Sequence, residues 1–343
     1  MAKSICFFNH KGGVSKTTTS YNLAYSLANL GKKTLLVDLD SQCNLTSLFF
    51  GFNEDFNIEQ IYQSNQYITL DKIINDFLSS GKTLDVITEK LVQSKHNPNL
   101  YLLAGSPNLD EFSNQLSSII KGVGEAFASL KSIPGYLAKL ITNLSEKDKF
   151  DYIILDLNPS KNGLNQIFLF NSDFFIIPCF PDYFCYKAIE SLINFLPKWK
   201  QELDRFQDSN PTFHKIKTDA KFLGIIEQNF RIRNQKPAKS FKNWIDKIRE
   251  KSILLVNELE KTNNVISKDK FTEITQNTPY DLAEINDFNS LIAQSQLHGK
   301  PVFELTKEEI EQKGQPLKNM IISQETFKEK FNTLAQNIIQ LTS

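Results

Sequence analysis

An eight-residue segment near the N-terminus, Lys11–Thr18, contains the residue types that bind phosphate groups. It reads KGGVSKTT, follows a short apolar run and precedes a segment with helical spacing. The glycines at Gly12 and Gly13 allow a sharp turn in which successive backbone N–H groups point at phosphate oxygens. The helix that follows adds positive potential at its N-terminus. The segment therefore predicts a loop that binds a nucleoside triphosphate.

Two side chains of this segment have predicted roles in phosphate and metal binding. Lys16 is placed to reach the β- and γ-phosphates, and the hydroxyl of Thr17 is placed to bind Mg²⁺. The match to the ordinary P-loop is incomplete, because that pattern requires glycine where His10 and Ser15 stand. The alternative is a plain strand-to-helix turn with incidental lysines, which the combination of glycines, lysine and threonine directly before a helix disfavours. The predicted nucleotide-binding residues here are Lys11, Gly12, Gly13, Val14, Ser15, Lys16, Thr17 and Thr18.

Carboxylates follow two further apolar runs. Asp38 and Asp40 end the run that begins at Thr34, and Asp156 ends the run that begins at Tyr152. Open α/β sheets bind ligands at the carboxyl ends of their strands, so these side chains are candidates for the same site. An aspartate after an apolar strand can hold a Mg²⁺-bound water, which is the role predicted for Asp156. For Asp38, a cap of a loop or helix is an equal alternative.

The apolar pattern predicts an α/β fold, a P-loop NTPase with a mostly parallel, twisted sheet and helices on both faces. Continuous, non-alternating apolar runs separated by helical segments are typical of such sheets. We expect one domain over residues 1–343, with a helical insertion around 53–147 and a C-terminal helix around 323–341. The predicted strands are Ser4–Phe8, Thr34–Leu39, Leu100–Ala104, Tyr152–Leu157, Phe174–Pro178 and Phe222–Ile226.

Composition restricts the class of protein. The 343 residues include 39 basic and 39 acidic ones, so no global positive field attracts nucleic acid. The four cysteines form no CxxC pair and suit neither a zinc site nor a disulfide framework. There is no signal peptide and no run of about 18 apolar residues, so we expect a cytoplasmic protein without integral membrane contact.

The predicted C-terminal helix has one apolar face. Its members recur at spacings of three and four, which is helical periodicity. We expect this face to pack on the core; a membrane-surface helix is the alternative, which Glu325 and Glu329 on the polar face disfavour. The face consists of Phe327, Phe331, Leu334, Ile338 and Leu341.

With its early lysine, the Lys11–Thr18 segment resembles the deviant Walker A ATPases of the ParA/MinD family. The resemblance implies that ATP and Mg²⁺ are the cofactors and that Lys11 reaches the phosphates of a partner in an ATP-bound homodimer. It also implies that Asp40 positions the attacking water, so that Lys11, Lys16 and Asp40 are the predicted catalytic residues. Thr17 and Asp156 are the predicted metal-binding residues.

The resemblance extends over most of the chain, with departures at two switch segments. The family usually has proline and glycine where Ser41 and Cys43 stand, and threonine and proline where Leu157 and Asn158 stand. The strand Phe222–Ile226 is similar to the one whose end contacts the base. Asn229 is accordingly predicted to recognise adenine, with a turn asparagine as the alternative.

The segment Arg231–Lys251 holds eight basic and two acidic residues, a local charge of +6. Such a segment can contact DNA phosphates without reading bases, although a solvated helix face is the alternative. With the resemblance, it predicts an ATPase, slow without a partner, that acts in plasmid or chromosome partition. The expected partners are nonspecific DNA and a ParB-like stimulating protein, and DNA binding would place the protein on the nucleoid.

Three other functions are considered. A MinD-like positioning ATPase would act on a membrane or a protein cargo, and a nucleotide-gated scaffold would show little turnover. An ATPase that carries an iron–sulfur cluster is rejected, because Cys179 and Cys185 match no known ligand pattern.

Overall fold

The computed structural model describes residues 2–52, 58–63, 66–80, 91–122, 132–147, 149–206, 216–233 and 236–343. Within them, the chain forms an eight-stranded sheet of order β10-β7-β6-β1-β5-β2-β4-β3. All neighbouring strands in it are parallel except β3 and β4. The strands are β1 (Lys3–Phe7), β2 (Thr34–Leu39), β3 (Val92–Gln93), β4 (Leu100–Leu103), β5 (Tyr152–Leu157), β6 (Phe174–Cys179), β7 (Lys221–Phe230) and β10 (Asp281–Asn286).

The predicted fold class is confirmed. The inner strands are mostly apolar and do not alternate because both faces of the sheet are covered, and β2 and β5 are buried at every position. The structure adds β10, which the sequence did not predict. This strand carries Asp281 and Glu284 and pairs only with β7 at the edge of the sheet. A short hairpin of β8 (Ile232–Arg233) and β9 (Lys236–Pro237) follows β7.

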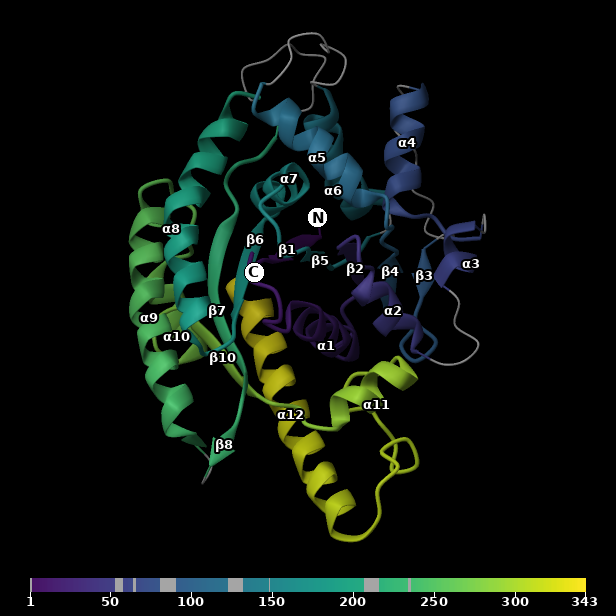
Figure 1. Ribbon diagram of the computed structural model, residues 1–343, viewed down its shortest axis with the longest axis vertical. Coiled ribbons are helices and arrows are strands. Elements are labelled where there is room, and N and C mark those ends of the chain that lie inside the picture. Colours follow the sequence, from purple (N-terminus) through teal and green to yellow (C-terminus); the bar gives the residue numbers. More distant parts are fainter. Residues whose placement is uncertain are drawn as a thin grey trace.

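Two layers of helices cover the sheet (Figure 1). Helices α5, α6 and α7 lie on one face, and α1 and α12 lie on the other. The long helices α8 and α9 pack against each other beside β7. The helices are α1 (Lys16–Asn29), α2 (Asn44–Phe50), α3 (Ile58–Gln63), α4 (Leu70–Ser80), α5 (Leu109–Ile120), α6 (Ile133–Lys147), α7 (Gly163–Asn171), α8 (Tyr183–Asp204), α9 (Lys239–Glu260), α10 (Lys268–Thr275), α11 (Leu291–His298) and α12 (Gly314–Leu341).

The C-terminal helix α12 packs along α1. The five apolar residues at helical spacing are each at most 1% exposed, so this structure leaves them no free apolar face. The helix begins at Gly314, before the expected start near residue 323. Among the helices that the structure describes, none is both long and apolar enough to cross a bilayer.

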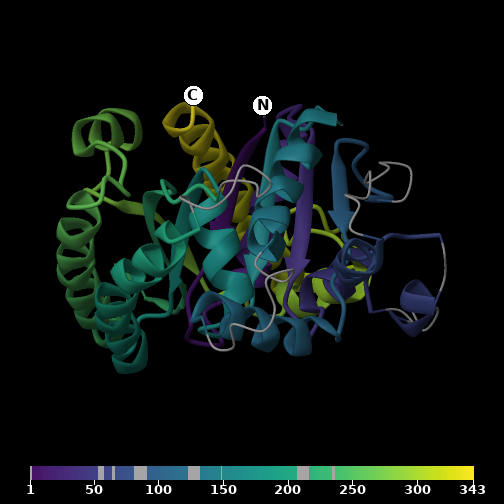
Figure 2. The same cartoon turned by 90° about the horizontal axis from the view of Figure 1, so that it is seen from above.

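The topology places one site at the middle of the sheet. Strand β1 lies between β5 and β6. After β1 the chain crosses past β5 to form β2, whereas after β5 it crosses past β1 in the opposite direction to form β6. These opposite crossovers leave a crevice at the carboxyl end of β1, where open α/β sheets bind ligands. Figure 2 shows the N-terminal strand near the centre of the sheet. The Lys11–Thr18 segment begins at this crevice.

Candidate nucleotide-binding site

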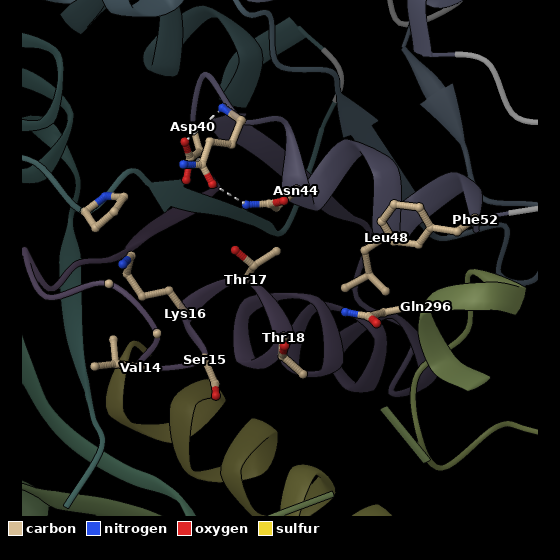
Figure 3. A pocket seen from close by; sticks show the side chains of 14 residues that line it. Val14, Ser15, Lys16, Thr17, Thr18, Asp40, Asn44, Leu48, Phe52 and Gln296 are labelled. Atoms are coloured by element: carbon tan, nitrogen blue, oxygen red, sulfur yellow. Dashed lines mark hydrogen bonds between the residues drawn. The ribbon is translucent and has the colours of Figure 1, made fainter. Parts of the chain in front are cut away.

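The loop between β1 and α1 forms one wall of the candidate site (Figure 3). Gly13 has φ = 71° and Ser15, at the N-cap of α1, has φ = 55°. Both values are in the left-handed region, which turns the backbone sharply into the helix. A Cβ atom built on Gly12 or Gly13 would meet no heavy atom within 4 Å, so the space above the loop is open. The loop can therefore hold a phosphate group close to its backbone.

Lys16 is the buried cation of this loop, with 7% of its surface exposed. Its Nζ donates a hydrogen bond of 3.1 Å to the backbone oxygen of Asn9. Burial lowers the pKa of Lys16, and the nearby carboxylates of Asp156 and Asp40 oppose that shift. The lysine thus lies between the loop and two acidic side chains, where the phosphates of a nucleotide would meet it.

Asp156, at the end of β5, is 1% exposed, and its Oδ1 has no hydrogen-bond partner among the described residues. Burial, followed by the charge of Asp38, raises the pKa of Asp156 to about 7, while a hydrogen bond with Thr17 acts in the opposite direction. A buried carboxylate oxygen without a partner is costly unless a cation approaches it. A carboxylate beside a threonine hydroxyl is a donor set that suits Mg²⁺, so these residues fit the predicted ion.

The two aspartates at the end of β2, Asp38 within the strand and Asp40 after it, have different contacts. Asp38 is fully buried and pairs in register with Asp156. Its Oδ2 accepts hydrogen bonds from Thr46 N (2.8 Å) and Thr46 Oγ1 (2.7 Å), so it anchors the start of α2. A Cβ on Gly105 would come within 2.9 Å of Asp38 Cγ, which explains a glycine there. Asp40 instead lines the cavity, and its Oδ1 accepts a hydrogen bond from Gln42 N (3.0 Å).

A cavity of about 360 Å³ lies above the loop, a volume within the usual range for small-molecule sites. Figure 3 shows the side chains of Lys16, Thr17 and Asp40 around it, with Leu48 and Phe52 at the other end. The cavity is lined by Gly12, Gly13, Val14, Ser15, Lys16, Thr17, Thr18, Asp40, Gln42, Asn44, Leu48, Phe52, Pro159 and Gln296. Seven of the eight loop residues predicted from the sequence are in this set; Asp156 is not, but it interacts with Thr17, which is.

Lys11 and Asn229 do not line this cavity. Lys11 Nζ lies 2.7 Å from Asp182 Oδ2 and 2.8 Å from Asp182 Oδ1, and 5.1 Å from the centre of the Phe180 ring. Asn229 is exposed near the end of β7, with φ = 62°. The roles of both residues stay predictions.

Sequence reasoning missed two polar residues that shape the site. Gln228 on β7 is 1% exposed; its Nε2 donates a hydrogen bond of 2.6 Å to Val14 O, and its Oε1 accepts one from Thr19 Oγ1. Gln228 therefore fixes the phosphate loop from β7, which is separated from β1 by β6 in the sheet. Asn158 follows β5, and its Oδ1 accepts hydrogen bonds from Ser160 N (3.1 Å) and Asn165 Nδ2 (2.8 Å). This network orders the segment in which Asn158 replaces the family's proline.

The basic segment Arg231–Lys251 is less uniform than its charge indicates. Arg249 is not available to a partner, because its Nε lies 2.8 Å from Glu227 Oε1 and its Nη2 lies 2.6 Å from Glu284 Oε1. Asp281 also pairs with this guanidinium. Lys242 and Lys251 form ion pairs with Asp246 and Glu190. The exposed basic side chains with no ion pair in the described part are Arg231, Lys236, Lys239 and Lys247.

Comparison with known proteins agrees with this geometry. The family model for an AAA domain matches residues 2–208, which is more than half of the chain. The chain belongs to the ParA/MinD family of P-loop ATPases. Soj, the sporulation initiation inhibitor protein of Bacillus subtilis, is 31% identical over 57% of this chain. The chromosome partitioning protein ParA of Myxococcus xanthus is 28% identical over 60% of it. The chain spans 64% and 61% of these two relatives, less than two thirds of each.

Several solved structures share the fold. Protein DIP2308 of Corynebacterium diphtheriae matches with a TM-score of 0.66 and 19% identity over 99% of this chain and 98% of its own. A variant of Cyanothece McdA in complex with ATP has a TM-score of 0.59 and 19% identity over 93% of this chain and 95% of its own. A Mycobacterium smegmatis cobyrinic acid a,c-diamide synthase with bound ADP and magnesium has a TM-score of 0.53 and 18% identity over 73% and 82%.

Proposed function

We propose that the protein is an ATP-dependent dimerising ATPase that acts in plasmid or chromosome partition. Two copies would bind ATP and Mg²⁺, close on each other, and bind DNA without sequence preference. A partner protein would stimulate a slow hydrolysis of ATP to ADP and phosphate, and DNA would then be released. The resemblance to Soj and ParA, which are named for sporulation control and chromosome partitioning, supports this role.

Each site residue has a task in this scheme. The backbone of Gly12–Thr18 and the Lys16 ammonium bind the β- and γ-phosphates and stabilise the charge that develops on them. Thr17 and Asp156 hold Mg²⁺, which neutralises phosphate charge when bound. Asp40, at the mouth of the cavity, orients the attacking water. Asn229 contacts the base.

The position of Lys11 is the observation that supports the proposed dimer. Lys11 belongs to the phosphate loop by sequence, yet its ammonium lies on Asp182, outside the cavity that the rest of the loop lines. In that position the lysine does not face its own nucleotide, and to reach a second copy it would exchange its ion pair with Asp182 for the partner's phosphates. The proposed role of Lys11 is therefore to complete the partner's site.

The DNA surface is proposed to consist of the hairpin β8–β9 and the start of α9. The exposed cations of this region that form no ion pair with a described residue are Arg231, Lys236, Lys239 and Lys247. Contacts of this kind bind phosphates without reading bases and are sensitive to salt.

Binding to a nonspecific DNA duplex tests the proposal. It should be measured by fluorescence anisotropy with ATP, with ADP and without nucleotide, across a salt series, for wild type and for Lys11→Ala. ATP-dependent, salt-sensitive binding that Lys11→Ala abolishes is the expected result. If ATP binds and DNA does not, the DNA role is wrong, and a MinD-like positioning ATPase or a scaffold with little turnover becomes the better hypothesis.

A further inference from the structure

The first turn of α8 exposes two large aromatic side chains. Phe184 is 68% exposed and Tyr183 is 50% exposed. Tyr183 lies edge-on to Phe184, with 5.7 Å between ring centres, and edge-on to Trp244 of α9 at 6.0 Å. We call Tyr183, Phe184 and Trp244 the α8 aromatic patch. Aromatic residues exposed together are characteristic of interaction surfaces rather than of ordinary protein surface.

Tyr183, the first residue of the patch, directly follows Asp182, which pairs with Lys11. Asp182 is the N-cap of α8, and its Oδ1 accepts hydrogen bonds from both Cys185 N (2.7 Å) and Lys11 Nζ (2.8 Å). The Lys11 ammonium and the first turn of α8 are thus joined through one carboxylate. Any molecule that comes within reach of Lys11 must approach this turn as well.

Three lysines and one glutamate lie around the patch. Lys187 and Lys251 both pair with Glu190, at 2.6 Å and 3.3 Å, and the Lys247 ammonium lies 4.7 Å from the centre of the Trp244 ring. One glutamate offsets only one of these three lysines, and a cation–π contact does not cancel a charge, so the surroundings of the patch stay positive. The aromatic rings themselves offer apolar contact area of the kind that protein interfaces bury.

We propose that Tyr183 and Phe184 form the apolar centre of the ATP-dependent contact between two copies of this chain. The inference rests on the proposed function, in which Lys11 crosses to the partner. In a two-fold dimer the same surface occurs on both copies, so residues beside Lys11 on one copy face the neighbourhood of the other copy's phosphate loop. Aromatic residues near the centre of an interface carry much of its binding energy.

Analytical ultracentrifugation with a non-hydrolysable ATP analogue and Mg²⁺ tests this contact. The dimer dissociation constant should be measured for wild type, Tyr183→Ala, Phe184→Ala and Leu254→Ala. Leu254 is the matched control, because it is 49% exposed and lies ten residues, about 15 Å, further along α9 than Trp244. We expect Phe184→Ala to weaken the dimer by about tenfold or more and Leu254→Ala to leave it unchanged.

Two further measurements make the result decisive. Affinity of the monomer for the analogue should stay at the wild-type value in Phe184→Ala, which shows that the variant folds. Phe184→Cys should give a dimer with a short bifunctional thiol reagent only when the analogue is present, since the four native cysteines are buried.

The possible failures are distinguishable. If wild type binds the analogue and stays monomeric, the proposed function loses its dimer and the inference falls with it. If wild type dimerises and Phe184→Ala dimerises equally well, only the inference is wrong. Loss of DNA binding by Phe184→Ala with unchanged dimerisation would also overturn it, and would assign the patch to nucleic acid.

Discussion

Gln228 joins β7 to the phosphate loop, with its Nε2 2.6 Å from the backbone oxygen of Val14. The same side chain accepts a hydrogen bond from Thr19 Oγ1, in the first turn of α1. Both contacts are buried. The conformation of the loop therefore depends on a residue more than 200 positions away in the sequence.

Gln228→Leu should weaken the binding of ATP and of ADP to a similar degree. The variant leaves Val14 O and Thr19 Oγ1 without their partner, at a cost of about 1–3 kcal/mol, or about five- to 150-fold if it acts entirely on the nucleotide-bound loop. Isothermal titration calorimetry measures the affinities. Asn229→Ala is the control, and it should instead change the preference between ATP and GTP. Unchanged affinities in Gln228→Leu would show that the loop keeps its shape without this clamp.

Asp156→Asn should raise the stability of the nucleotide-free protein while it lowers Mg²⁺-dependent binding of ATP. Asp156 is buried, and one of its oxygens has no partner in the described part of the chain, so a neutral amide removes about 1–2 kcal/mol of desolvation cost. Urea unfolding without nucleotide and ATP binding with and without Mg²⁺ measure the two effects. Lys16→Ala is the comparison, and it should lose ATP with or without the ion. A stability loss in Asp156→Asn would contradict the argument.

The pKa of His10 should lie below 6.5 in the nucleotide-free protein and should increase when a nucleotide binds. Burial, with the charges of Lys161 and Lys16, lowers the pKa of His10 to about 4. The folded protein then binds fewer protons than the unfolded chain between pH 6.5 and 4, so the histidine's contribution to stability is lost as pH falls through this window. A nearby triphosphate favours the protonated ring. NMR of the histidine ring protons measures the pKa, with His10→Gln for assignment.

The effect of His10 on stability is measured as the difference between wild type and His10→Gln, because other groups titrate in the same pH range. Burial raises the pKa of Asp38 to about 6, and that carboxyl contributes with the opposite sign, since its stability is lost as pH rises. The free energy of unfolding of wild type relative to His10→Gln should therefore decrease from pH 7 to pH 4. A constant difference would contradict the expected shift.

Arg249→Leu should destabilise the fold, and Lys247→Ala should not. Removal of one partner from a buried ion-pair network costs about 3–5 kcal/mol, because Glu227 is left buried without its counter-charge. An exposed lysine contributes within about 0.5 kcal/mol. If the proposed DNA surface is correct, Lys247→Ala instead reduces the salt dependence of DNA binding by about one contact. Urea unfolding and salt titrations separate the two outcomes.

Local spacing accounts for what the sequence could predict. The phosphate loop occupies eight consecutive residues, and Asp156 lies near the end of an apolar strand, so both are visible in a single stretch of chain. Gln228 has no such signal, since its partners Val14 and Thr19 lie in the phosphate loop and on α1, far away in the sequence. Strand β10 was missed for a related reason. Asp281 and Glu284 make it look like a solvated segment until Arg249 on α9 is seen to neutralise them.

Arg249 lies near the middle of helix α9, and its ion pairs fix the helix to two strands of the sheet. Glu227 lies on β7, and Asp281 and Glu284 lie on β10, so the helix cannot turn about its axis without breaking them. Exposed cations at the start of α9 consequently keep a set direction relative to the sheet before any ligand arrives. If they meet a polyanion, the encounter requires no folding step. Its rate should then be governed by long-range attraction and should decline steeply as ionic strength increases.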